Sequence, residues 1–246
     1  MFPFSLASFG IGSAKVDTRI EQNRVRAGDY LRGTVYVFGG NSSQTVDSIY
    51  LYIVTQYSKG SKMQHYIFKE YRLANSFVIE PGQKEEIPFK IRIPIDLPMS
   101  CGKYPIYLKT GLDIQMAIDP TDEDRFEVLP IPVVSQVLKY IEEAGFVLHS
   151  VVNQFAKEGD RPHPFIQNFH FRPDGRYRGY IDDLNVFFEV QPEDIFVDME
   201  IIRDQSALYT NFYWNFDQPR ETFCINGEKY EKDPMIGIQE FLRKGQ

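Results

Sequence analysis

The chain has only two cysteines in 246 residues, Cys101 and Cys224. They lie far apart and form no C-x-x-C pair, so the sequence holds neither a disulfide framework nor a cysteine zinc motif. Sparse cysteine is typical of a reducing compartment, and we therefore expect the protein in the cytoplasm. Neither cysteine has a catalytic signature around it, so we expect small core or turn residues.

The sequence also lacks long apolar runs, and it has no basic residues in its N-terminal segment. No stretch of about 18 apolar residues occurs, so we expect no integral membrane segment. Residues 1–14 carry no charged side chain, which argues against a secretory signal. Phe2, Leu6 and Phe9 have the spacing of one helical stripe. That stripe fits a segment packed on a core, with docking to a membrane or partner as the alternative.

Positive charge is not in excess. The net charge is −7, and residues 1–130 hold 15 basic and 15 acidic side chains, against 12 and 19 in residues 131–246. Binding to phosphates requires a basic stripe, so we expect no nucleic acid partner. The uneven placement predicts two units with different surfaces, the second suited to steering basic partners.

Nucleotide-binding loops are absent as well. Gly28 and Gly33 have the glycine spacing of a phosphate loop, but Thr34-Val35 follows where Lys-Ser/Thr is required. The next residues resemble a strand, so no helix N-terminus would meet a phosphate. We interpret Gly28 and Gly39-Gly40 as turns and Gly33 as a strand glycine at a bulge or close approach.

Catalytic and metal motifs are missing too. There is no G-x-S-x-G elbow, and the four histidines show no H-x-H or H-x-x-x-H pair: His65, His149, His163 and His170. The acidic run at 119–124 lacks the order of a calcium loop, and we expect a solvated turn before a strand at 126–129. The pairs Asp182-Asp183 and Glu193-Asp194 would point to opposite strand faces, or to water in a turn. We therefore predict no catalytic, cofactor-binding or metal-binding residue and no cofactor.

The clearest pattern in the sequence is the alternation of apolar and polar residues. Aromatics make up 15% of the residues, which favours strands. Ile49, Leu51 and Ile53 share one parity, and residues 85–94 place Ile87, Phe89, Ile91 and Ile93 on one face. Pro88 within that run predicts an edge strand or a bulge. Turn-rich points at 27–29, 39–41, 81–83 and 101–102 separate the runs. Short strands without helices between them predict an all-β fold, a sandwich or barrel.

The pattern of apolar and polar residues changes near residue 130. Pro130 and Pro132 precede a helical pattern near 134–144, which Gly145 would end. Strands resume after it, and residues 233–245 predict a C-terminal helix with its buried face at Met235, Ile238, Phe241 and Leu242. We therefore place one domain at 1–130 and a second at 131–246.

An aromatic cluster lies in residues 208–216, and its members are Tyr209, Phe212, Tyr213, Trp214 and Phe216. Such clusters fill strand cores, which is the interpretation we favour, or serve as partner anchors at sheet edges. The segment 81–93 is a second candidate edge, although Pro88 would limit strand pairing there.

The order of several segments resembles the bacterial sporulation-control protein family. The matching segments cover nearly the whole chain: KVDTRIEQNRVRAGDYLRGTVYVFGG, SIYLYIVTQY, the PG at 81–82, IPFKIRIPIDLP, YLKTGLDIQMAID, the D-x-D at 122–124, VLKYIEEAGF and QNFHFRP. The resemblance implies two arrestin-like β-sandwich domains joined by a short helix-containing connection. It also implies control of endospore formation in bacilli through protein partners, without catalysis, and it supplies no site residues.

We therefore expect a non-enzymatic regulator of endospore formation that acts as a protein-interaction scaffold. We expect its partners to be other proteins, with self-association through sheet edges as a further mode. Two rival hypotheses stay open. One is a β-sandwich that binds a small ligand or carbohydrate through aromatics such as Trp214, and the other is a metal-dependent hydrolase.

Overall fold

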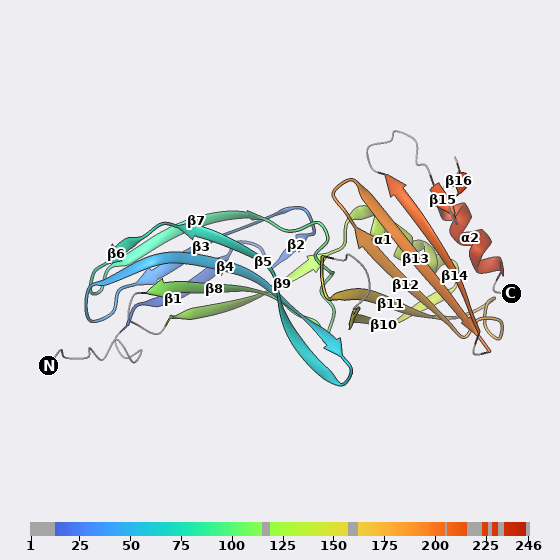
Figure 1. Cartoon of the computed structure of the whole chain (residues 1–246), viewed down its shortest axis with the longest axis horizontal. Coiled ribbons are helices and arrows are strands. Elements are labelled where there is room, and N and C mark those ends of the chain that lie inside the picture. The colour runs from blue at the N-terminus through green and yellow to red at the C-terminus, as the bar shows by residue number, and fades with distance from the viewer. Residues whose placement is uncertain are drawn as a thin grey trace. The chain divides into compact units, whose positions relative to one another are not determined.

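The structure is a computed structural model that describes residues 13–114, 119–156, 162–204, 206–215, 223–225, 228–230 and 234–244. It is built mainly of strands with two helices in these ranges (Figure 1), so the all-β fold class is confirmed. The chain forms two compact units, one of Met1–Gln56 with His65–Leu129 and the other of Tyr57–Gln64 with Pro130–Gln246.

The first unit contains two sheets. One has the order β1-β3-β7, with β1 at Lys15–Ile20, β3 at Tyr30–Phe38 and β7 at Lys84–Arg92. The other has the order β4-β8-β9-β2, and β5 and β6 also pair with β4. Its strands are β4 (Gln44–Lys59), β8 (Ile106–Ile114), β9 (Thr121–Leu129), β2 (Arg24–Arg26), β5 (Lys62–Ala74) and β6 (Phe77–Ile79).

Alternate side chains of both sheets are buried, as in a β-sandwich core. In β4, Ile49, Leu51 and Ile53 are inaccessible to solvent, which confirms the predicted parity. In β7, Phe89 and Ile91 are buried while Lys90 and Arg92 are exposed. This strand ends the order of its sheet, so Pro88, which cannot donate a backbone hydrogen bond, lies on an edge strand as expected.

Gly33 marks a close approach within the first unit. A Cβ atom there would lie 2.4 Å from the Arg19 carbonyl oxygen and 2.6 Å from the Phe89 ring. Gly28 has φ +89° in the turn between β2 and β3. The glycines of this stretch are thus explained by a turn and by packing.

The predicted solvated turn in the acidic run is wrong, because β9 already begins at Thr121. Asp122 and Asp124 share the parity of the buried Phe126 and Val128, and therefore face inward. The Thr18 amide donates a hydrogen bond to Asp122 Oδ2 at 2.6 Å. This bond gives Asp122 a partner that sequence spacing did not reveal.

The second unit is built on an antiparallel sheet of order β14-β13-β12-β11-β10. The strands are β10 (Phe146–Phe155), β11 (Phe165–Pro173), β12 (Asp183–Val190), β13 (Asp194–Arg203) and β14 (Ser206–Asn215), and a separate hairpin joins β15 (Phe223–Ile225) to β16 (Glu228–Tyr230). The tip of the β4–β5 hairpin also belongs here, since Tyr57 stacks on Phe165 at 5.4 Å and Ser58 pairs with Gln154. Our sequence boundaries had placed this tip in the first domain.

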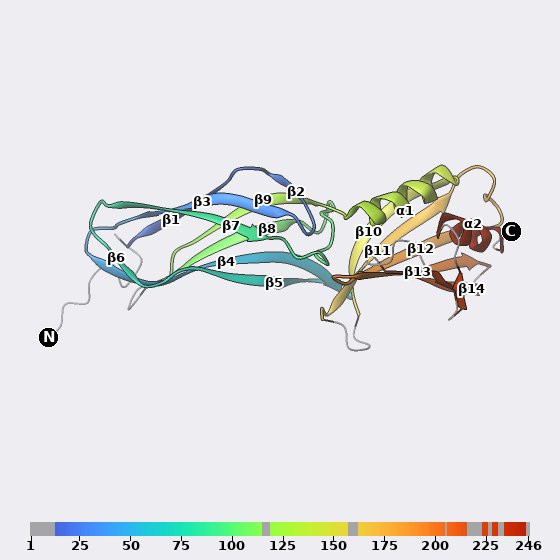
Figure 2. The ribbon, with the colours of Figure 1, turned by 90° about the horizontal axis from the view of Figure 1, so that it is seen from above.

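Two helices complete the second unit. Helix α1 spans Pro132–Glu143, beginning two residues before the predicted helix because proline suits a first helical position, and Gly145 follows it at φ +103°. Figure 2 shows α1 running along one face of the sheet. Helix α2 spans Pro234–Lys244 and buries Ile238, Phe241 and Leu242 as predicted. Asp233 and Gly245 lie outside the described residues, and so does the Met235 side chain.

In the described ranges, neither helix has the length and apolar character needed to cross a membrane. Phe2, Leu6 and Phe9 fall outside those ranges.

Candidate functional site

The sheet of the second unit has one buried face and one accessible face. Buried side chains on β11, β12 and β13 are Phe169, Phe171, Leu184, Val186, Ile195, Val197, Met199 and Ile201. Because successive strand residues point to opposite faces, the residues between them project outward. The outward positions of β11 to β14 include five carboxylates: Asp183, Glu189, Asp194, Asp198 and Glu200. Among the described side chains of this surface, His170 and Arg172 are the basic ones, and we call the surface the acidic face.

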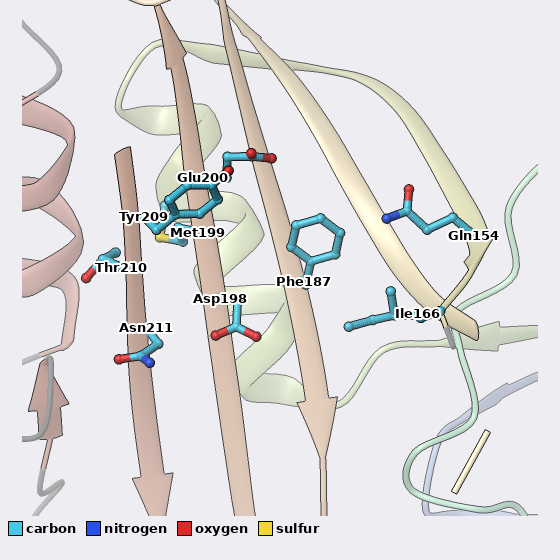
Figure 3. Close-up of a pocket in the computed structure, with 10 residues that line it drawn as sticks. Gln154, Ile166, Phe187, Asp198, Met199, Glu200, Tyr209, Thr210 and Asn211 are labelled. Atoms are coloured by element: carbon cyan, nitrogen blue, oxygen red, sulfur yellow. The ribbon is translucent and has the colours of Figure 1, made fainter. Parts of the chain in front are cut away.

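A shallow pocket of about 430 Å³ lies on the acidic face. Figure 3 shows its side chains, with α1 behind the strands. The lining residues are Gln154, Ala156, Ile166, Phe187, Asp198, Met199, Glu200, Tyr209, Thr210 and Asn211. The pocket thus combines carboxylates, amides and two aromatic rings from β10, β12, β13 and β14, and β11 contributes Ile166.

Strand register arranges these side chains in two rows. Phe187, Asp198 and Asn211 lie opposite one another on β12, β13 and β14. The next row contains Asn185, Glu200 and Tyr209. Each carboxylate of the pocket therefore has an aromatic side chain on a neighbouring strand.

Hydrogen bonds fix the second row. Asn168 Nδ2 donates to Asn185 Oδ1 at 3.3 Å, and Asn185 Nδ2 donates to Glu200 Oε2 at 2.9 Å. A hydrogen bond with Glu200, together with its negative charge, raises the pKa of the Tyr209 phenol. Tyr209 is nevertheless 70% exposed, so its ring is held at one end and open to a ligand over its face.

A second series of side-chain contacts crosses the acidic face. His170 Nε2 lies 2.6 Å from Asp183 Oδ1, and Arg172 Nε donates to the same oxygen at 3.4 Å. Ser150 Oγ lies 3.5 Å from His170 Nδ1. The residue types match a hydrolase triad, but the serine contact is at the long limit of a hydrogen bond. We therefore interpret these contacts as a hydrogen-bonded network that orders the side chains on this face of the sheet.

The aromatic cluster of β14 is not a simple core strand. Tyr209 is largely exposed, whereas Tyr213 is half-buried and donates to Asp194 Oδ1 at 2.6 Å. The side chains of Phe212 and Trp214 lie outside what the structure describes, as does Phe216. For Tyr209, the favoured interpretation as a core residue is wrong, because its side chain is largely exposed.

Among the other candidate residues, His149 packs edge to face against His170 with 5.3 Å between ring centroids, but Cys101 and the Asp182-Asp183 pair form no common site. Burial raises the pKa of the Cys101 thiol to about 11, which makes it a poor nucleophile, and the Cys224 side chain is not described. Asp182 accepts from the Asp204 amide while Asp183 contacts His170, so this pair does not share a site. Within the described ranges, no three histidine, cysteine or acidic side chains gather as metal ligands.

Comparison with known proteins gives the chain a family. The family model described as SpoOM protein, Spo0M, matches residues 2–205. The chain belongs to the Spo0M family. It is 35% identical over 207 residues to the sporulation-control protein Spo0M of Bacillus subtilis strain 168, covering 82% of this chain and 80% of that protein.

A solved structure supports the same assignment. The crystal structure of Spo0M from B. subtilis matches with a TM-score of 0.81 and 27% identity, over 96% of this chain and 100% of that chain. The resemblance identified from the sequence is therefore confirmed, and it supports a regulatory role in sporulation for this Spo0M family member.

Sequence reasoning missed the acidic face, although part of its signal was present. Residues 194–203 alternate buried Ile195, Val197, Met199 and Ile201 with outward Asp198 and Glu200. Their partners on β11, β12 and β14 depend on register, which only the folded sheet supplies.

Proposed function

We propose that the protein is a non-enzymatic regulator of endospore formation that acts in the cytoplasm as a protein-interaction scaffold. The observation that carries the proposal is the acidic face, with its ordered polar side chains and exposed Tyr209. Interfaces are enriched in tyrosine, and a hydrogen-bonded surface loses little side-chain entropy on binding. Family membership supplies the link to sporulation.

The edge of the sheet supports the same role. β14 ends the sheet order, and Ala207, Leu208 and Tyr209 are exposed on successive positions. The Ser206–Tyr209 end of this strand is exposed, and an edge strand can offer its backbone to a partner strand or to another copy of the chain. The protein would therefore use a face and an adjoining edge.

The test combines a binding assay with a cell assay. A strain that lacks its own family member is complemented with the wild-type chain or with the double variant Asp198→Asn/Glu200→Gln, and spores are counted. Affinity capture from sporulating cells is run with both proteins. We expect wild type to restore the normal spore count and to retain a defined partner that the variant loses.

A matched control keeps this test specific. The double variant Glu142→Gln/Glu143→Gln removes two exposed carboxylates of α1 in the same unit. It should behave as wild type in both assays. If both double variants sporulate and capture proteins as wild type does, the acidic face has no part in the function.

The pocket favours one other candidate function. Aromatic rings beside amide and carboxylate groups, as in Phe187, Gln154 and Asn211, also suit a carbohydrate or another small polar ligand. A ligand that binds only the folded protein must raise its melting temperature. We expect sugars to leave the melting temperature of the protein unchanged. A rise in melting temperature that Tyr209→Ala abolishes would support the ligand-binding function instead.

A further inference from the structure

The acidic face pairs carboxylates at a regular spacing. Asp198 and Glu200 are two residues apart on β13 and project from the same face (Figure 3). This places them about 7 Å apart along the strand, which is the spacing of alternate side chains in an extended peptide. An extended segment lying along β13 would therefore present two alternate side chains to this pair of carboxylates.

Aromatic rings stand beside both carboxylates. Phe187 is opposite Asp198 and Tyr209 is opposite Glu200 in the register. A cation held by a carboxylate and covered by a ring gains from charge and from the ring's quadrupole. Gln154 and Asn211 add amide oxygens at the margin of the pocket. A guanidinium group uses such a set better than an ammonium group, because it is planar and carries five donors.

Charge on the surroundings agrees with a basic ligand. Asp183, Glu189 and Asp194 continue the acidic face beyond the pocket, while Arg172 contacts Asp183. The first unit differs, since the outward positions of β1, β3 and β7 carry Arg19, Arg32, Lys90 and Arg92. The acidic face is therefore a property of one sheet, and it suits a positively charged partner by complementarity.

We infer that the acidic face binds an extended basic segment of a partner protein, and that an arginine side chain of this segment enters the pocket between Asp198 and Glu200. This inference rests on the proposed function, because it names the chemistry of the partner that the scaffold would bind. The ligand is a strand-like stretch with arginines at alternate positions.

Synthetic peptides test the inference directly. The full chain is titrated into three fluorescein-labelled heptapeptides in which glycine alternates with arginine, lysine or glutamate. Fluorescence anisotropy is recorded at 50 and 300 mM sodium chloride. We expect the arginine peptide to bind, the lysine peptide to bind several-fold more weakly, and the glutamate peptide not to bind. Affinity should fall with salt.

Variants locate the binding. Asp198→Asn/Glu200→Gln should weaken arginine-peptide binding by about tenfold or more, and Phe187→Leu by a few-fold. The matched control Glu142→Gln/Glu143→Gln should change it less than about twofold. Melting curves of all variants show whether each is folded. No binding by wild type, or an equal loss in the control, would overturn the inference.

The two levels of the proposal can fail separately. If the Asp198→Asn/Glu200→Gln variant loses the peptide but restores normal spore counts, the basic ligand stands and the proposed function of this face is overturned. If the variant fails to restore sporulation while the wild-type protein does not bind the arginine peptide, the proposed function stands. The inference that the partner segment is basic is then overturned.

Discussion

The hydroxyl oxygens of Thr18 and Thr110 lie 2.6 Å apart in the core of the first unit. Thr18 belongs to β1 in the three-stranded sheet, and Thr110 belongs to β8 in the other. Both side chains are buried, and Thr110 is inaccessible to solvent. This hydrogen bond therefore links the two sheets of the unit through a pair of polar groups that water does not reach.

Replacing Thr110 with valine should leave the Thr18 hydroxyl buried without its partner. We expect Thr110→Val to lower the free energy of unfolding by about 1–2 kcal/mol, measured by urea titration. The double variant Thr18→Val/Thr110→Val should lose less than the sum of the single variants, because it removes both polar groups. Thr121→Val, at an exposed position on β9, should change stability by less than about 0.5 kcal/mol. Additive losses would contradict the pairing.

Asp124 should make the first unit more stable as the pH falls. Burial, followed by the charges of Asp122 and Asp17, raises the pKa of Asp124 to about 6, and its Oδ2 is buried without a hydrogen bond among the described residues. The unfolded chain has a pKa of about 4, so the folded state binds more protons between pH 4 and 6. The stability cost of ionising Asp124 is thus fully present above pH 6 and lost as the pH falls toward 4.

The variant Asp124→Asn removes this cost. We expect it to raise the free energy of unfolding by about 1 kcal/mol at pH 7.5, a figure discounted for partial exposure, and by about a third of that at pH 4.5. Asp113→Asn, at an exposed position of β8, is the control and should shift neither value appreciably. A constant difference across this range would show that Asp124 is ionised at an ordinary pKa.

Gly33 should not tolerate a side chain. An alanine Cβ would lie 2.4 Å from the Arg19 carbonyl oxygen on β1, so the backbone of a neighbouring strand would have to move. We expect Gly33→Ala to cost about 2–3 kcal/mol in chemical denaturation. Gly111→Ala is the matched control on β8, where the nearest atom is Tyr52 Cε2 at an ordinary 3.7 Å. That variant should stay within about 1 kcal/mol of wild type.

The Tyr177 hydroxyl contributes nothing favourable to the second unit. Tyr177 is inaccessible to solvent and stacks on Phe146 at 5.0 Å, but its oxygen has no partner among the described residues. Tyr177→Phe should therefore leave the free energy of unfolding unchanged or raise it by up to about 1 kcal/mol, and the melting temperature should not fall. Tyr177→Ala should cost about 3–5 kcal/mol, because the ring fills the core. A clear loss in the phenylalanine variant would mean that the hydroxyl is bonded in solution.

Much of the fold could be predicted from local pattern. Alternation identified β4 and β7 with their buried faces, and helical spacing followed by Gly145 identified α1. Both signals depend on neighbouring residues along the chain, so they survive without tertiary information. The acidic run failed because a charged sequence suggests a solvated turn, whereas Asp122 receives the Thr18 amide from a strand more than 100 residues away.

The sequence by itself determined the all-β class, the change of pattern near residue 130, the acidic excess of the second half and the resemblance to the sporulation-control family. These follow from composition, residue order and short-range periodicity. Only the tertiary structure decided that Asp198, Glu200, Phe187 and Tyr209 share one surface, and that the 57–64 tip joins the second unit. Strand register brings together residues from separate parts of the chain, and register is set by packing of the whole sheet.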